Sequence, residues 1–257
     1  MQSPTASEHR QVRPGWTGLS VGALRVSTPL FLVSLVLFIL AVPFLTGYPY
    51  GDIVESVLLT LILASGVFAI GASRGTLIFA AALVVPGLIA KWINHFSPEA
   101  MPPGIHLAIG VVFLAFVSVH LLRFLLRAPR VDTQVLQTGI ATYLVFGLLW
   151  SLAYLLVARL LPGAFSMSGE PGPGQVMDSF TALYFSFVTL STMGYGDIVP
   201  VARAARMLAI LEATTGVLYM SVLIARLVGL YSTVTPLDPM PDPNGTATQP
   251  SPGAGVP

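Results

Sequence analysis

Six consecutive residues between two long apolar stretches have the composition of a cation site built from backbone carbonyls. They are Thr192, Met193, Gly194, Tyr195, Gly196 and Asp197. Glycines at alternate positions permit backbone dihedrals that line carbonyl oxygens along one axis. Together with the Thr192 hydroxyl, these oxygens can replace the water around a dehydrated cation. We expect the Met193 and Tyr195 side chains to point away from that axis and to brace the loop.

A short apolar segment, residues 178–191, precedes this loop and contains no proline. Asp178 or Ser179 is suited to cap a helix by accepting hydrogen bonds from its first N–H groups. At about 1.5 Å per residue this helix reaches only about 20 Å, too short to cross a hydrocarbon core of about 30 Å. Backbone that is not helical at this depth needs polar partners, and a bound cation supplies them. The segment therefore predicts a re-entrant helix followed by a cation-binding loop.

Residues 189–197 resemble the selectivity filter of the tetrameric potassium channel family, whose pattern is Thr-x-x-Thr-(Val/Ile/Met)-Gly-Tyr-Gly-Asp after a short pore helix. The resemblance implies a six-span, voltage-gated-like channel that conducts K⁺ passively. It implies K⁺ sites at Thr192, Met193, Gly194 and Tyr195, with Gly196 completing the ion path. It also implies support of the filter by Asp197, Val188 and Tyr184.

The filter region departs from the family pattern at Val188, where some members place a glutamate bonded to the residue that matches Asp197. Filter inactivation coupled to that pair is therefore not expected. Tyr184 and Phe185 stand where many members have paired tryptophans. Sodium-conducting and nonselective relatives usually lose the Gly-Tyr-Gly that this chain keeps, and a nonselective cation channel is the alternative within the same class.

Gly216 lies at the position of the family's inner-helix hinge. Glycine inside a helix costs about 0.5–1 kcal/mol, which either bending or close helix packing would offset, and both interpretations stay open. The resemblance further implies that Val217, Met220 and Ile224 face a water-filled cavity below the filter.

Six apolar runs approach the length that a membrane-spanning helix needs, and the chain is 54% hydrophobic and only 9% charged. The third run is short and contains Pro86, so it could be tilted or kinked. We expect an all-α membrane protein with six transmembrane helices and the re-entrant pore helix and filter loop between the fifth and sixth. The six runs are residues 28–45, 53–71, 75–90, 104–122, 135–161 and 206–231.

Four regions follow from these runs: a cytoplasmic segment over residues 1–27, four peripheral, degenerate voltage-sensor-like helices over 28–130, a pore domain over 131–231 and a disordered cytoplasmic tail over 232–257. Placing both termini in the cytoplasm puts most Lys and Arg residues inside, as the positive-inside rule favours. The filter loop then lies on the outer face of the cell membrane.

One such loop per chain cannot enclose a pore, so the chain must assemble with copies of itself, and the family implies a homotetramer. Membrane lipid is the other expected partner. Nucleic acid is not, because the net charge is only +1 and the basic residues are scattered. The chain has no cysteine, which excludes thiol chemistry, and we expect no cofactor besides permeant K⁺. Abundant Ala, Gly, Leu and Arg with almost no Lys suit a GC-rich prokaryote.

Weaker signals concern ionisable residues. Arg123 and Arg127 share a helical face and resemble a remnant voltage sensor, although a positive-inside anchor explains them better. Glu55 is expected at the outer interface. Glu212 is expected to bond pore-helix hydroxyls or a basic partner behind the filter, rather than the ion. The histidines His106 and His120 suit either pH sensing or interfacial caps.

Residues 71–75 match the G-x-S-x-G nucleophile pattern, with Ser73 as the candidate nucleophile of an intramembrane serine protease. The match follows a predicted helix rather than a strand and falls in a short turn, where small residues are common. We therefore expect no enzymatic activity, and an unchanged ion flux after Ser73 is replaced would exclude this rival.

Overall fold

A computed structural model of the chain describes residues 17–45, 48, 50–69, 74–97, 102, 104–128, 132–167 and 177–232. The described part is mostly helical, as predicted. Its elements are α1 (Thr17–Leu45), α2 (Gly51–Ala69), α3 (Arg74–Phe96), α4 (Ile105–Arg127), α5 (Thr133–Leu160), β1 (Phe165–Met167), α6 (Ser179–Leu190), β2 (Ile198–Pro200) and α7 (Arg203–Ser232).

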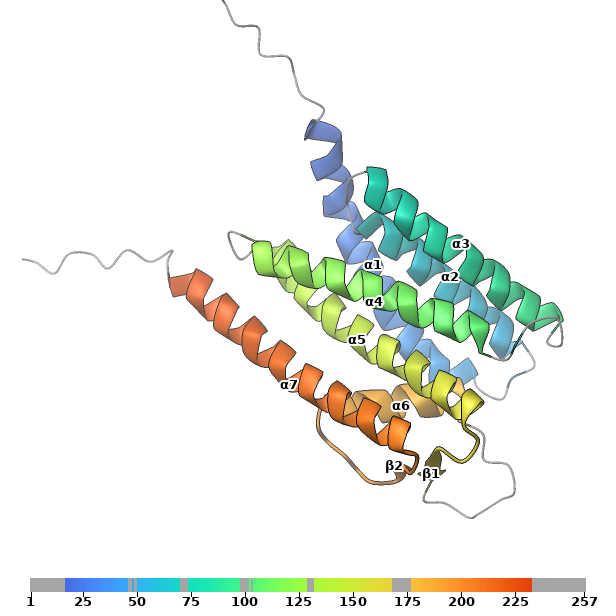
Figure 1. Cartoon of the computed structure of the whole chain (residues 1–257). Coiled ribbons are helices and arrows are strands. Elements are labelled where there is room, and N and C mark those ends of the chain that lie inside the picture. Colours follow the sequence, from blue (N-terminus) through green and yellow to red (C-terminus); the bar gives the residue numbers. More distant parts are fainter. Residues whose placement is uncertain are drawn as a thin grey trace, which may run out of the picture.

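Helix α5 stands between two groups of helices (Figure 1). It packs against α4 and α1 on one side and against α7 on the other, while α2 and α3 complete the group with α1 and α4. The short helix α6 lies across one end of this arrangement and contacts α5, α7 and α1. Strands β1 and β2 pair antiparallel beside it, with Met167 opposite Ile198. The fold therefore holds α6 where α5 and α7 meet.

Four of the described helices are long and apolar enough to cross a membrane, which makes the chain a membrane protein. They are Thr28–Leu45 within α1, Ile105–Arg127, Thr133–Leu160 and Arg203–Gly229. Within the described residues, α2 and α3 carry only the shorter apolar stretches Ile53–Ile62 and Val84–Ile93. Helices thus form at all six predicted positions, and the six-span arrangement stays a prediction.

Three helices run well beyond the predicted apolar runs. Helix α1 begins at Thr17 rather than at residue 28, and helix α3 continues through Pro86 to Phe96. Helix α4 continues past the charge-free run that ends at residue 122 and includes Arg123 and Arg127, because Leu and Arg both favour helix. It stops where Ala128 turns extended, with φ −61° and ψ 125°, as expected for a residue before proline. Ser73 and the predicted tail after residue 232 lie outside the described residues.

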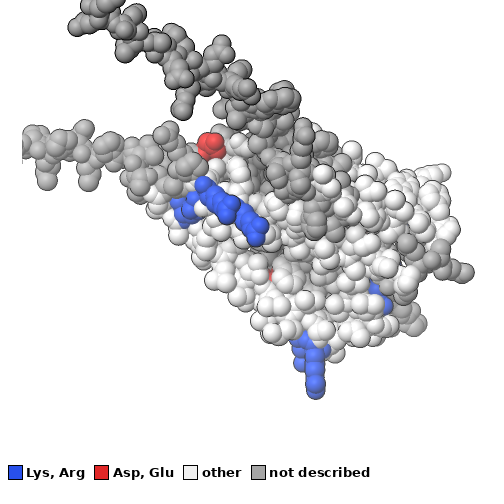
Figure 2. Space-filling model, turned by 45° about the horizontal axis from the view of Figure 1, so that its top comes forward, with Lys and Arg blue, Asp and Glu red and all other residues white. Residues whose placement is uncertain are grey.

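The charged residues collect at the two ends of the helices. Figure 2 shows Lys and Arg side chains toward opposite ends of the molecule, with a broad uncharged surface between them. One end holds the last turn of α4 with Arg123 and Arg127. The other holds Arg159 in the last turn of α5 and Arg203 at the start of α7. This separation fits helices that cross an apolar layer.

Candidate functional site

Helix α6 begins and ends with side-chain hydrogen bonds. The Asp178 carboxylate accepts the backbone N–H of Thr181 at 2.7 Å, which confirms the predicted cap. At the other end the Ser191 backbone N–H and hydroxyl both donate to the Phe187 carbonyl, at 3.0 and 2.6 Å. The helix is thus fixed at both termini, and residues 192–197 follow directly from its C-terminal end.

Two glycines allow α5 and α7 to approach α6 closely. A Cβ atom at Gly147 of α5 would lie 2.4 Å from the Phe187 ring. One at Gly216 of α7 would lie 2.2 Å from the Leu190 carbonyl oxygen. Contacts this short are not tolerated in a packed interior. Close packing of Gly216 is therefore observed directly, while its role as a hinge stays a prediction.

Glu212 joins three helices behind the loop. Its carboxylate is fully buried in α7 and accepts a hydrogen bond from the Tyr154 hydroxyl of α5. The Ser186 hydroxyl of α6 lies 2.5 Å from its other oxygen and 2.8 Å from the Gly147 carbonyl. The prediction that Glu212 bonds hydroxyls of this short helix is confirmed. A buried carboxylate with both oxygens engaged holds the helices in one arrangement.

The backbone φ angle alternates in sign along residues 192–196. Thr192, Gly194 and Gly196 have φ angles of 59°, 56° and 79°, whereas Met193 and Tyr195 do not have positive φ. Alternation of this kind turns successive N–H groups to one side of the chain and forms a concavity that binds a negative partner. The glycines were expected to adopt such angles; the positive φ at Thr192 was not foreseen.

The partner in this concavity is the Val188 carbonyl near the end of α6. It accepts the N–H groups of Met193 at 2.9 Å and Gly194 at 3.3 Å. The described residues contain no cis peptide, so each C=O points opposite to the N–H of the next residue. The carbonyls of Thr192 and Met193 therefore point away from α6. Within the described part of the chain, no hydrogen bond reaches the carbonyls of residues 192–196.

The loop is uncovered within the part of the chain that the structure describes. The Met193 and Tyr195 side chains are 61% and 68% exposed, so the predicted bracing by these two side chains is not seen among the described residues. A Cβ atom at Gly194 or Gly196 would meet nothing within 4 Å. These two glycines are thus needed for their backbone angles rather than for space.

Tyr184 and Asp197 close the far end of the loop. The Tyr184 hydroxyl donates to one Asp197 oxygen at 2.7 Å, and the Ile198 N–H donates to the other at 3.0 Å. This hydrogen bond raises the pKa of Tyr184, so the hydroxyl stays a donor well into alkaline solution. The three predicted support residues meet around the loop, with Val188 acting through its carbonyl.

The other predicted residues lie on separate surfaces. Val217, Met220 and Ile224 are all exposed on α7, whereas Gly216 faces α6. Arg123 and Arg127 are exposed at the end of α4 and form no ion pair within the described residues. Nothing in that part of the chain therefore supports a charge moving between acidic partners.

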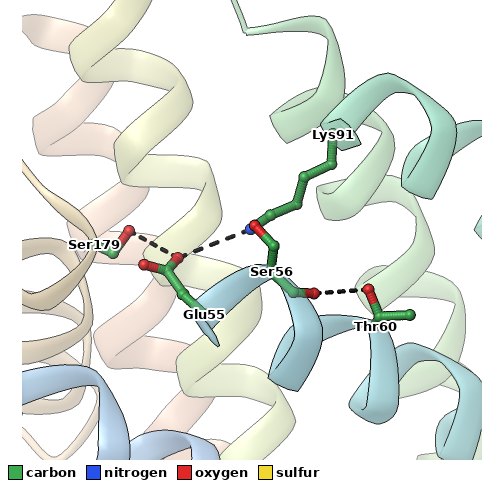
Figure 3. Close-up of polar contacts among 5 residues, drawn as sticks. All are labelled: Glu55, Ser56, Thr60, Lys91 and Ser179. Carbon is green, nitrogen blue, oxygen red and sulfur yellow. Dashed lines mark hydrogen bonds and ion pairs between the residues drawn. The ribbon is translucent and has the colours of Figure 1, made fainter. Parts of the chain in front are cut away.

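Glu55 links α2 to the start of α6, as Figure 3 shows. Its Oε1 atom accepts the Ser179 hydroxyl at 3.0 Å and lies 3.9 Å from the Lys91 ammonium of α3. The place of Glu55 at the outer membrane interface stays a prediction. His120 instead approaches the Phe116 carbonyl of its own helix at 3.2 Å.

Several structural residues were missed from the sequence. Tyr154 and Ser186 carry no signal of their partnership with Glu212, which needs three helices to meet. Arg226 of α7 donates to the carbonyls of Leu125 at 3.0 Å and Ala128 at 2.8 Å, and so caps the C-terminus of α4. An arginine near the end of a long apolar helix was the only available signal for this contact.

Among the described residues no group of three or more His, Asp or Glu side chains could hold a metal ion. The polar atoms of the loop that have no partner within the described residues include the backbone carbonyls of residues 192–196. Such carbonyls suit a weakly held monovalent cation that exchanges them for water.

Comparison with known proteins agrees with this geometry. Residues 140–232, from α5 to the end of α7, match the family model described as an ion channel. The chain is 49% identical over 47 residues to two-pore potassium channel 4 of Arabidopsis thaliana, a match that covers 18% of this chain and 16% of the relative.

Two bacterial proteins are also similar. The chain is 37% identical over 87 residues to the inward rectifier potassium channel Kirbac3.1 of Paramagnetospirillum magnetotacticum, covering 34% of this chain and 25% of the relative. It is 44% identical over 55 residues to the voltage-gated potassium channel Kch of Escherichia coli K12, covering 21% and 13%. No solved structure matches the chain.

The chain spans at most a quarter of the length of these relatives. All three matches are to proteins named as potassium channels. They confirm the predicted resemblance to potassium channels. Residues 140–232 match an ion channel family model, and the relatives to which the chain is similar are potassium channels.

Proposed function

We propose that the chain conducts K⁺ selectively and passively through a filter formed by residues 192–196. K⁺ would be held by Thr192, Met193, Gly194 and Tyr195, with Gly196 completing the path. The names of the relatives support K⁺ as the ion, since each is a potassium channel. A nonselective cation channel is the alternative.

The observation that carries this proposal is the position of the Val188 carbonyl, which binds the N–H groups of Met193 and Gly194. That contact turns the carbonyls of Thr192 and Met193 away from α6, where they find no partner in the described residues. Several such carbonyls around one axis would replace the hydration shell of K⁺. Repulsion between ions at successive sites would keep them moving.

The exposed loop and the exposed face of α7 argue for a homotetramer. One chain supplies one wall of a filter, and three further copies would supply the others. Val217, Met220 and Ile224 are apolar and exposed in the single chain, so they would line the cavity below the filter. Membrane lipid would cover the outer helices.

The full arrangement that we propose has six membrane-spanning helices, with α6 as a re-entrant pore helix. Helices α1 to α4 would form the peripheral group and α5 to α7 the pore. The filter end would face the outside of the cell membrane, and both termini would lie in the cytoplasm. The group of Arg123, Arg127 and Arg226 at the opposite end supports this orientation.

The proposal is tested by ion flux from liposomes that contain the purified chain. Efflux should occur for K⁺ and not for Na⁺. Gly194→Ala should abolish it, because alanine resists a φ of 56° at a cost of about 1–2 kcal/mol. Gly229→Ala is the matched control, since a Cβ atom at that exposed site on α7 meets nothing within 4 Å.

Equal K⁺ and Na⁺ efflux would replace the proposal with the nonselective channel. Native mass spectrometry of the same preparation tests the assembly, and four chains per particle is the expected result. A monomer or dimer that still conducts K⁺ would contradict the four-fold filter.

A further inference from the structure

A cavity of about 320 Å³ lies where α2, α3, α4 and α5 meet the start of α6. It is separate from the filter loop, because none of its lining residues lies in residues 192–197. Water occupies about 30 Å³ per molecule, so the cavity has room for about ten heavy atoms. It is therefore large enough for a small organic molecule and too small for the two acyl chains of a phospholipid.

The walls of this cavity are mostly apolar, and its rim is charged. Aliphatic and aromatic side chains from the five helices α1 to α5 form the walls; they include Phe38, Leu59, Leu88, Phe113, Leu148 and Leu152. Ionisable groups gather on one side: Glu55, Lys91, His106, Arg159 and Asp178. A cavity with apolar walls and charged groups on one side suits a molecule with one charged end and one apolar end.

Both carboxylates on the rim already have partners. Glu55 accepts the Ser179 hydroxyl at 3.0 Å and lies 3.9 Å from the Lys91 ammonium (Figure 3). Asp178 accepts the Thr181 N–H at the start of α6. Both negative groups are thus already compensated, Glu55 by the Lys91 ammonium and Asp178 by an N–H group at the start of α6.

The basic side of the rim includes two groups that form no hydrogen bond within the described part of the chain. Within the described residues, the Arg159 guanidinium forms no hydrogen bond or ion pair, and the His106 ring forms no hydrogen bond. Lys91 and Arg159 both lie close enough to act electrostatically on His106. The rim thus carries two acidic and two basic side chains, and Arg159 is the charged one that has no partner within the described residues, so it can pair with an anionic head group.

We propose that this cavity binds a single-chain carboxylate amphiphile of about ten carbons in total, such as decanoate. Its carboxylate would accept hydrogen bonds from Arg159 and His106. Its tail would lie between Leu88 of α3 and Leu152 of α5, and would reach Leu183 of α6. The ligand would thus touch the helix that carries the filter loop.

The test uses a decanoate analogue with a diazirine at the tail end, together with the alcohol of the same tail. Each is photolysed with the purified full chain in detergent, and adducts are mapped by peptide mass spectrometry. The acid should label the segments around Leu88 and Leu152, and the alcohol should label them far less. Excess unlabelled decanoate should displace the label and decanol should not, which tests the site without any variant.

Arg159→Gln should lower labelling by about tenfold, the change expected for loss of one charge-assisted hydrogen bond. Arg159→Lys should retain part of it. Arg203→Gln is the matched control, because Arg203 is an exposed arginine near the same end that does not line the cavity. Equal labelling by acid and alcohol, or labelling that survives Arg159→Gln, would overturn the proposal.

Discussion

The contact between Gly216 and α6 leads to a quantitative prediction for Gly216→Ala. The new methyl group would lie 2.2 Å from the Leu190 carbonyl oxygen and 3.1 Å from a Leu190 methyl carbon. Contacts under 3.0 Å are essentially never seen for real Cβ atoms, so α7 must move away from the end of α6. Overpacking of this kind typically costs about 1–3 kcal/mol.

Alanine also favours helix over glycine by about 0.5–1 kcal/mol, and this gain must be separated from the steric cost. Gly229→Ala does so, because Gly229 lies in the same helix and a Cβ atom there meets nothing within 4 Å. The gain in helix propensity is the same for both variants. The difference between their free energies of unfolding is therefore the steric cost of about 1–3 kcal/mol.

Thermal unfolding of the purified variants in detergent, followed by near-UV circular dichroism, measures this difference. For a chain of this size about 1 kcal/mol corresponds to 2–4 °C, so Gly216→Ala should melt roughly 2–12 °C below Gly229→Ala. Equal melting temperatures would refute the close contact with Leu190. If the two variants melted alike but only Gly216→Ala altered K⁺ flux, the hinge interpretation would be favoured instead.

Three further predictions concern side-chain hydrogen bonds between helices and at the filter loop. Tyr154→Phe should destabilise the fold by about 1–3 kcal/mol, because it leaves one oxygen of the buried Glu212 without a donor; thermal unfolding checks this, and an unchanged Tm would contradict it. Tyr184→Phe should lower K⁺ over Na⁺ selectivity in liposome flux by releasing Asp197, and unchanged selectivity would show that the bond is dispensable. Because that bond raises the pKa of Tyr184 above the usual value near 10, its contribution is fully present at neutral pH and is lost only as pH rises through the raised value. Arg226→Lys keeps the charge but cannot hold both carbonyls at the end of α4, so it should increase amide hydrogen exchange there, and unchanged protection would contradict the cap.

The helices and the loop could be predicted from the sequence because their signals are local. Apolar runs predicted the six helix positions, and Asp178 predicted the start of α6. The two glycines of the loop predicted the alternating backbone, because glycine has no Cβ atom and readily adopts positive φ. The partnership of Glu212 with a hydroxyl of α6 followed from the cost of leaving a carboxylate unpaired in an apolar helix.

Other features depend on which helices approach each other, which no local signal specifies. The role of Gly147 arises only because Phe187 of α6 packs on it. Arg226 caps a helix about a hundred residues earlier in sequence, and its own surroundings in α7 do not indicate that partner. The positive φ at Thr192 is imposed by the same contacts that hold residues 193 and 194 to Val188. Helix α4 continues beyond its charge-free run and ends at Arg127, because charge alone does not end a helix.

The most direct test of the proposed filter is the reversal potential of the purified chain in a planar bilayer with K⁺ on one side and Na⁺ on the other. A reversal potential that follows the K⁺ gradient, and channel currents lost in Gly194→Ala but kept in Gly229→Ala, is the predicted result. A reversal potential near zero in the unmodified chain would mean that residues 192–196 do not distinguish K⁺ from Na⁺, and would contradict a potassium filter.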